Sequence, residues 1–206
     1  LVNAILQNGG QTCSAGSRVL IEKPLFERVA AGLAERFSAL VAAPHDADRD
    51  LGALINARQR GRVAAMVSEA EAAGAPVLAR GSIAPDAPAG GFYFAPVLFG
   101  STDPSDRIAQ EEIFGPVLTL FPFDDEADAI RLANGTDYGL VAGIWTKDGA
   151  RQHRVARRVR AGQVFVNAYG AGGGVELPFG GFKRSGHGRE KGFEALYDMS
   201  ASKTVV

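Results

Sequence analysis

Segments with the spacing of amphipathic helices alternate along this chain with short, uniformly apolar segments, and that order constrains the fold more than any other feature. Over residues 24–40, apolar side chains recur at steps of three and four behind a proline that suits a first helical turn. A second helix is predicted over Asn56–Ala73, with Gly74 ending it. The predicted strands are Arg18–Ile21, Pro76–Ala79, Val117–Phe121, Leu140–Trp145 and Gln163–Asn167, and Phe92–Phe99 is predicted to be extended.

The predicted strands are too uniformly apolar for a sheet that exposes one face to water. They are therefore expected to be buried on both sides. We predict an α/β fold in which a mostly parallel open sheet carries helices on both faces. In such sheets, ligand sites gather at strand ends and in the loops that follow them.

The second half of the chain adds two helices and an apolar end. Asp124 is predicted to cap one helix, and Asp148 is predicted to cap another that runs to about Arg160. The last residues, Lys203–Val206, have extended β-type sequence. We predict that they add an edge strand to a neighbouring subunit, because a free apolar edge promotes association.

Charge and composition exclude several classes of protein. The 206 residues include 22 Lys and Arg against 23 Asp and Glu, a net charge of -1, so the basic excess that neutralises nucleic-acid phosphates is missing. No uninterrupted apolar stretch approaches the ~20 residues that span a bilayer. One cysteine cannot form an intramolecular disulfide, and no cysteine–histidine cluster has metal-ligand spacing. We expect a cytoplasmic protein with no metal site and with neither nucleic-acid nor membrane partners.

The single cysteine, Cys13, lies in the glycine-rich segment Gly9–Arg18 between an apolar helical segment and a strand. Its small and polar neighbours leave the backbone open to close approach by a ligand. A tight glycine loop can also direct backbone N–H groups at an oxyanion. A lone cysteine is, however, often only a small buried residue. Spacing alone leaves both a nucleophile and a structural thiol open.

Other catalytic and phosphate-binding motifs have little support. The three histidines could each partner a cysteine in a hydrolase, but none lies in a segment that favours this role. The segment Gly170–Gly174 lacks the final glycine of GxGxxG. Gly181–Gly186 is followed by a histidine where a phosphate-binding P-loop needs lysine.

The segment Gln110–Val117 places two acids, an aromatic ring and a Gly-Pro turn ahead of an apolar strand. A carboxylate at such a place can accept hydrogen bonds from a ribose diol, and a ring can pack on a flat heterocycle. An acidic turn at a helix end, followed by a core phenylalanine, gives the same pattern. Both interpretations are open at this point.

Taken in order, three segments resemble parts of the aldehyde dehydrogenase family. Gly10–Arg18 resembles its nucleophile loop, Glu111–Val117 its cofactor segment, and Pro178–Glu190 its C-terminal signature. The resemblance extends over nearly the whole chain, and three such segments in one order are hard to obtain by chance. It implies the family's fold and the oxidation of an aldehyde to a carboxylic acid with NAD or NADP.

The resemblance assigns chemical roles residue by residue. Cys13 attacks the aldehyde carbonyl to give a thiohemiacetal, hydride passes to the nicotinamide, and water releases the acid from the thioester. Glu112 accepts hydrogen bonds from the nicotinamide ribose, and Phe114 packs near the nicotinamide ring. Gln59 and Arg62 correspond to a pair that helps fix the cofactor, with arginine at 62 where lysine is expected.

The resemblance also assigns residues to the substrate. Thr12 and Ser14 flank the nucleophile at the foot of a substrate tunnel. The loop Ala168–Leu177, which contains Tyr169, forms the mouth of that tunnel. The substrate implied is a small-molecule aldehyde.

The chain departs from the family because it lacks the nucleotide-binding domain that precedes the cysteine in family members. That domain supplies a general-base glutamate, an asparagine of the oxyanion hole and most adenosine contacts. We therefore expect residues 1–190 to be the catalytic domain of a longer enzyme and residues 191–206 to be the oligomerisation tail of a dimer or tetramer. We expect the 206-residue chain alone to be inactive. The alternative is an isolated, non-catalytic α/β domain that acts in self-association.

Overall fold

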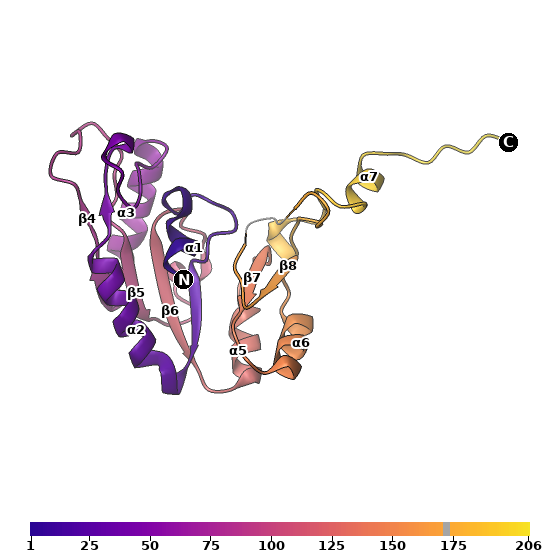
Figure 1. Ribbon diagram of the computed structural model, residues 1–206, viewed down its shortest axis with the longest axis horizontal. Coiled ribbons are helices and arrows are strands. Elements are labelled where there is room, and N and C mark those ends of the chain that lie inside the picture. Colours follow the sequence, from indigo (N-terminus) through magenta and orange to yellow (C-terminus); the bar gives the residue numbers. More distant parts are fainter. Residues whose placement is uncertain (171–173) are drawn as a thin grey trace. The chain divides into compact units, whose positions relative to one another are not determined.

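The computed structural model describes residues 1–170 and 174–206, shown as a ribbon in Figure 1. The chain divides into two compact units, residues 1–129 and residues 130–206. The predicted domains, residues 1–190 and 191–206, stay a prediction. The two units are described in turn.

A four-stranded sheet forms the centre of the first unit (Figure 1). Its strands, in spatial order, are β1 (Arg18–Glu22), β6 (Val117–Phe123), β5 (Val97–Ser101) and β3 (Val77–Arg80). β6 pairs in parallel with both β1 and β5, whereas β3 pairs antiparallel at one edge. The prediction of a mostly parallel sheet is confirmed.

Two apolar cores cover the two faces of this sheet, because neighbouring side chains along a strand point to opposite sides. On one side, Leu98 and Leu118 pack with Leu33 of helix α2 (Lys23–Ser38). On the other side, Val97, Phe99 and Val117 pack with helix α3 (Ala57–Ala72) and with Ile108 of helix α4 (Arg107–Gln110). The central strands are therefore buried on both faces, and helices lie on both sides as predicted.

Local sequence signals fix the bounds of helix α3. The Asn56 side chain accepts a hydrogen bond of 2.9 Å from the N–H of Gln59, which satisfies one donor of the first turn. Gly74 follows the helix with a φ of +90°, a conformation that glycine adopts without strain. The predicted helix is confirmed.

Of the segment Phe92–Phe99, which is predicted to be extended, only the last part joins the sheet, because the strand covers Val97–Ser101. Pro96 has no N–H to give to a strand ladder. The carbonyl of Phe92 accepts instead from the N–H of Leu54, outside the sheet. The remaining elements of the first unit are α1 (Val2–Leu6), η1 (Gln7–Gly10), the parallel pair β2 (Val41–Ala42) and β4 (Ser82–Ile83), and η2 (His45–Ala47).

The second unit is built on a parallel pair of strands, β7 (Val141–Ile144) and β8 (Gln163–Val166), with helix α6 (Gly149–Arg158) between them in sequence. Asp148 caps α6 as predicted, since its side chain accepts from the N–H of Arg151 at 3.1 Å. The other elements are η3 (Lys183–Ser185) and α7 (Glu194–Asp198).

Helix α5 (Glu126–Ala133) leads from the first unit into the second. The predicted cap at Asp124 is wrong. The side chain of Asp125 accepts from the N–H of Asp128 at 2.8 Å, while the carboxylate of Asp124 pairs with Lys23. Either of the two consecutive aspartates fits the capping position by its sequence, but the Asp124 side chain is held by the ion pair with Lys23.

The C-terminal signature serves as a tertiary connection within the second unit. The Lys183 ammonium donates to the carbonyls of Asn134, at 2.9 Å, and Thr136, at 2.7 Å, both just beyond the end of α5. Phe179 and Glu190 exchange two backbone hydrogen bonds of 2.7 Å. The signature thus closes on itself and is tied to the segment that follows α5.

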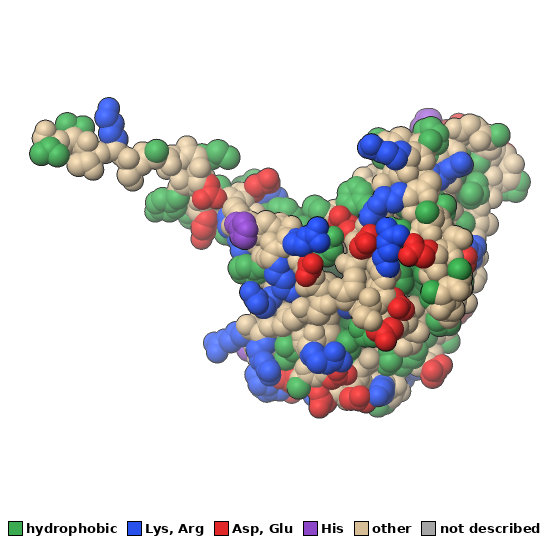
Figure 2. Space-filling view, turned by 180° about the vertical axis from the view of Figure 1, so that it is seen from behind, with side chains coloured by type: hydrophobic (Ala, Val, Ile, Leu, Met, Phe, Trp, Pro, Cys, Tyr) green, Lys and Arg blue, Asp and Glu red, His purple; other side chains and the backbone are tan. Residues whose placement is uncertain are grey.

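The end of the chain exposes apolar side chains, and green side chains are visible along this segment in Figure 2. Phe193, Tyr197 and Met199 are each at least 79% exposed. Lys203–Val206 forms no strand within the described chain, so its predicted pairing with a neighbouring subunit stays a prediction. Of the described helices, none combines the length and the hydropathy that crossing a bilayer requires.

We predict that Lys183→Met destabilises the second unit by about 2 kcal/mol, because two carbonyls lose a charged donor beside a helix C-terminus. Lys147→Met is the matched control, since Lys147 is exposed. Chemical denaturation of both variants measures the difference. Equal free energies of unfolding would show that the Lys183 hydrogen bonds contribute nothing net.

Candidate active site

Cys13 is exposed in a tight turn between η1 and β1. The N–H of Ala15 donates to the carbonyl of Thr12 at 2.9 Å and closes the turn around the thiol. The N–H of Gly16 donates to the carbonyl of Ala4 at 2.9 Å, which anchors the end of the turn to α1. A thiol at such a place is reachable by a ligand, so the structure removes the interpretation of Cys13 as a buried packing residue.

The base of this loop is braced by amide side chains. Asn8 and Gln11 each donate a hydrogen bond of 3.0 Å to the other's carbonyl. Gln11 also accepts from the N–H of Ile55 at 2.9 Å, which ties the loop to the segment before α3. Asn8, Gly9 and Gly10 all have positive φ, and two glycines in three positions make that bend accessible.

The two neighbours of Cys13 lie in different surroundings. The Thr12 hydroxyl donates to the carbonyl of Gln7 at 3.3 Å and remains partly exposed. Ser14 is only 4% exposed, so its side chain points into the protein. Their predicted contacts with a substrate stay predictions.

The nucleophile loop packs directly on the segment Glu112–Pro116. The backbone of Gly10 lies so close to the carbonyl of Gly115 that a Cβ on Gly10 would overlap it. A Cβ on Gly115 would in turn lie 2.6 Å from Cγ2 of Val63, a fully buried residue of α3. The two loops and the helix are therefore in direct van der Waals contact. Neither Gly10 nor Gly115 has room for a Cβ.

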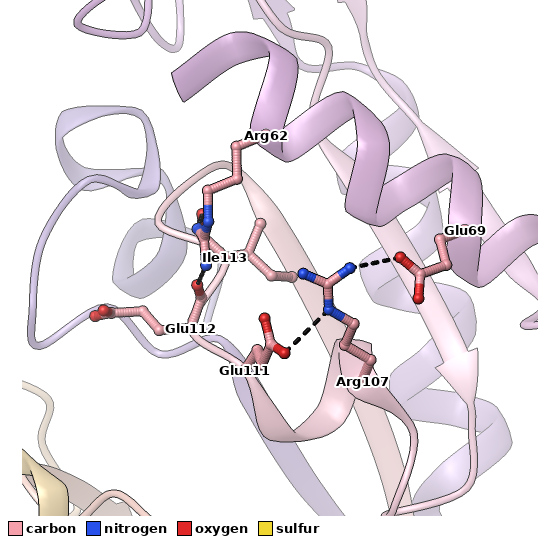
Figure 3. Close-up of polar contacts among 6 residues, drawn as sticks. All are labelled: Arg62, Glu69, Arg107, Glu111, Glu112 and Ile113. Atoms are coloured by element: carbon pink, nitrogen blue, oxygen red, sulfur yellow. Dashed lines mark hydrogen bonds and ion pairs between the residues drawn. The ribbon is translucent and has the colours of Figure 1, made fainter. Parts of the chain in front are cut away.

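Helix α3 also holds this segment by hydrogen bonds to its carbonyls. The Gln59 amide donates to the carbonyl oxygens of Ile113, at 3.0 Å, and Phe114, at 2.8 Å. The Arg62 guanidinium donates to those of Glu112, at 2.6 Å, and Ile113, at 2.7 Å (Figure 3). Gln59 and Arg62, which sequence resemblance places at the cofactor, bind the backbone of the segment that carries Glu112 and Phe114.

Phe114 has a φ of +59°, a conformation that costs energy for any residue with a Cβ. Its neighbours on both sides are fixed, since Ile113 is buried and Gly115 packs on Val63. The Phe114 ring itself is only partly buried. Strain of this kind persists where the surrounding contacts impose it, and such positions cluster at functional sites.

The two consecutive acids of the segment have different surroundings. The Glu111 carboxylate lies 3.0 Å from Nε of Arg107, and the same guanidinium lies 2.6 Å from the carboxylate of Glu69 on α3. These two carboxylates raise the pKa of Arg107, Glu111 contributing most. The Glu112 carboxylate points away from both Arg62 and Arg107 (Figure 3), and it makes no ion pair in the described part of the chain. Glu112 is thus the acid that can receive a ligand.

The predicted end of the substrate tunnel belongs to the second unit. Asn167, at the end of β8, accepts from the N–H of Thr146 at 3.0 Å and donates to its carbonyl at 3.1 Å, which fixes the start of the loop. Tyr169 follows and is partly buried. Residues 171–173 of the predicted mouth lie outside the described residues. The place of Tyr169 at the mouth of the substrate tunnel stays a prediction.

The position of the site on the sheet differs from expectation. Cys13 and Glu112 both lie in loops that precede their strands, β1 and β6, and not in loops that follow them. Sequence reasoning also missed Arg107 as the partner of Glu111, although a spacing of four residues at the end of a short helix indicates such a pair. Cys13 makes no hydrogen bond to a histidine within residues 1–170 and 174–206, so a Cys/His hydrolase finds no support there.

Comparison with known proteins gives one consistent result. The model of the aldehyde dehydrogenase family matches residues 1–205. Betaine aldehyde dehydrogenase 1 of Rhizobium meliloti is 41% identical over 197 residues, which are 95% of this chain and 40% of the relative. A crystal structure from Burkholderia cenocepacia, assigned as an aldehyde dehydrogenase, is 62% identical with a TM-score of 0.94 and covers 97% of this chain and 42% of its own.

A mutant of aldehyde dehydrogenase C from Pseudomonas syringae, in complex with NAD+ and octanal, is 37% identical with a TM-score of 0.87. It covers 95% of this chain, which corresponds to 40% of its own length. The chain therefore spans about two fifths of the length of these relatives. Because the family model matches residues 1–205, the chain belongs to the aldehyde dehydrogenase family.

Proposed function

We propose that this chain carries the nucleophile and part of the cofactor site of a longer enzyme, which oxidises an aldehyde to a carboxylic acid with NAD or NADP. One observation carries the proposal: the loop that exposes Cys13 packs through Gly10 on the segment that presents Glu112 and Phe114. A nucleophile and a cofactor-binding segment held together in this way satisfy the need for fixed relative positions in hydride transfer. The length of the relatives supports the proposal of a longer enzyme.

Cys13 acts as the covalent catalyst in this proposal. Its thiolate adds to the aldehyde carbonyl, and negative charge develops on the carbonyl oxygen. The N–H of Cys13 donates to no backbone carbonyl in the described part of the chain, which leaves it available to that oxygen. The exposure of the thiol allows an aldehyde to approach it.

Glu112 and Phe114 hold the cofactor in this proposal. The exposed Glu112 carboxylate suits the two hydroxyls of a ribose, and the partly exposed Phe114 ring suits one side of a flat heterocycle. The nicotinamide cofactor, when bound, supplies the hydride acceptor. Complexes of relatives with NAD+, from Pseudomonas syringae and Bacillus cereus, support this assignment.

The relatives support an aldehyde substrate of either of two kinds. Several are betaine aldehyde dehydrogenases, and one structure contains octanal. A betaine aldehyde carries a quaternary ammonium group, whereas octanal is a plain aliphatic chain. Thr12, Ser14 and Tyr169 are the residues we propose at the substrate.

We also propose that the enzyme is a cytoplasmic homo-oligomer that associates through residues 191–206. The exposed apolar side chains Phe193, Leu196, Tyr197 and Met199 support self-association, because a patch of this kind is unfavourable in water. The inactivity of the 206-residue chain by itself remains a prediction.

The experiment that tests the function is the oxidation of betaine aldehyde, octanal and benzaldehyde by the full-length protein, followed by the absorbance of the reduced nicotinamide. We predict turnover with at least one aldehyde and a loss of roughly 1,000-fold or more in Cys13→Ala, because the covalent step is removed. The affinity for NAD+, measured by titration calorimetry, should stay unchanged. Undiminished turnover in Cys13→Ala would contradict the proposal, and a full-length protein inert toward all aldehydes would favour a non-catalytic domain.

We predict that Glu112→Gln lowers kcat/KM for the cofactor by about 100-fold, because a misplacement of ~1 Å can cost that much. Glu111→Gln is the matched control, since this neighbouring acid pairs with Arg107. It should affect thermal stability more than cofactor kinetics. Equal kinetic losses in the two variants would remove the distinction between the acids. A Glu112→Gln defect confined to acid release, in single-turnover kinetics, would show that Glu112 acts on water instead.

A further inference from the structure

The polar side chains on the first turns of α3 bind three consecutive carbonyls of the cofactor segment. Gln59 and Arg62 are three residues apart, so both project from one side of the helix. Together they make four hydrogen bonds, of 2.6 to 3.0 Å, to the carbonyls of Glu112, Ile113 and Phe114. The carbonyl of Ile113 accepts from both side chains.

These hydrogen bonds are made on both sides of a residue with an unfavourable backbone conformation. Phe114 has positive φ, and its two flanking peptide groups carry the carbonyls of Ile113 and Phe114. Rotation of Phe114 toward negative φ would turn these carbonyls away from their donors. The donors on α3 therefore oppose the relaxation that the Phe114 backbone would otherwise undergo.

We propose that Arg62, assisted by Gln59, is a positioning residue that sets the direction of the Glu112 carboxylate and the Phe114 ring through the backbone between them. This proposal rests on the function proposed above and goes beyond it, because the Arg62 side chain itself does not have to touch the cofactor. Its Nη1 and Nη2 donate to the successive carbonyls of Ile113 and Glu112 (Figure 3). Two donors in a rigid plane fix both carbonyls at once, whereas a lysine ammonium is a point charge on a flexible stem.

A purely electrostatic role for Arg62 makes a different prediction. If the positive charge alone attracted the cofactor phosphates, lysine at this position would serve equally well, and other arginines of α3 would contribute. Arg60 lies on the same helix, is exposed, and provides the comparison. The planar geometry of the guanidinium and its charge can therefore be separated by substitution.

The test uses the full-length protein with Arg62→Met, Arg62→Lys and the matched control Arg60→Met. Three quantities are measured: the dissociation constant of NAD+ by titration calorimetry, the steady-state constants for NAD+ and aldehyde, and the rate of Cys13 alkylation by iodoacetamide from peptide masses. The alkylation rate reports on the nucleophile loop without any cofactor.

We expect Arg62→Met to weaken NAD+ binding about 10-fold and to lower kcat/KM for NAD+ about 100-fold. The KM for the aldehyde and the Cys13 alkylation rate should stay within about twofold of the wild type. Arg62→Lys should recover only part of the loss, and Arg60→Met should behave like the wild type.

Three results would overturn the inference. Full recovery by Arg62→Lys would show that charge is sufficient, and equal effects of Arg62→Met and Arg60→Met would show that the position has no special role. A parallel loss of alkylation rate and melting temperature in Arg62→Met would assign the residue to general stability. Failure of the wild type itself to oxidise any aldehyde would instead contradict the proposed function, which keeps the two failures distinct.

Discussion

The site depends on one backbone contact, in which Gly10 of the nucleophile loop lies against the carbonyl of Gly115 without room for a side chain between them. Gly115 in turn lies against Val63 of α3 with equally little space. Three segments that are distant in sequence are thus packed at fixed separations. With such close packing, a shift of one segment displaces its neighbours, because interiors without voids have low compressibility. The position of the nucleophile loop is therefore linked, through Gly10 and Gly115, to the cofactor segment and to α3.

The sheet explains why these segments meet. The nucleophile loop enters β1 and the cofactor segment enters β6, and these strands are adjacent and parallel. Two loops that precede adjacent parallel strands must lie at the same edge of a sheet. The N–H of Thr119 donates to the carbonyl of Ser17 at 3.0 Å, so the pairing of the strands continues into the nucleophile loop. The hydrogen bonding of the sheet therefore reaches the loop that carries Cys13.

The sequence predicts the elements whose cause is local, and it misses those whose cause lies elsewhere in the chain. Helix α3 is predicted closely because Asn56 and Gly74 mark its ends, and β6 because a strand buried on both faces must be apolar throughout. The predicted cap of α5 is wrong because a distant lysine pairs with the first of two aspartates. Cys13 and Glu112 lie in segments with recognisable motifs. The hydrogen bonds of Arg62 to the carbonyls of Glu112 and Ile113, 50 and 51 residues away, can be identified only from the tertiary structure.

The central claim is that contact between the two loops positions the nucleophile and the cofactor segment together. Gly10→Ala and Gly9→Ala test it most directly, because both add a Cβ at positive φ, but the Cβ at Gly9 would meet its nearest atoms at an ordinary 3.6 Å. The measurement is kcat/KM for NAD-dependent aldehyde oxidation by the two full-length variants. We predict that Gly10→Ala is slower than Gly9→Ala by about 100-fold, since the added Cβ must push the loops apart. Equal rates for the two variants would contradict the account.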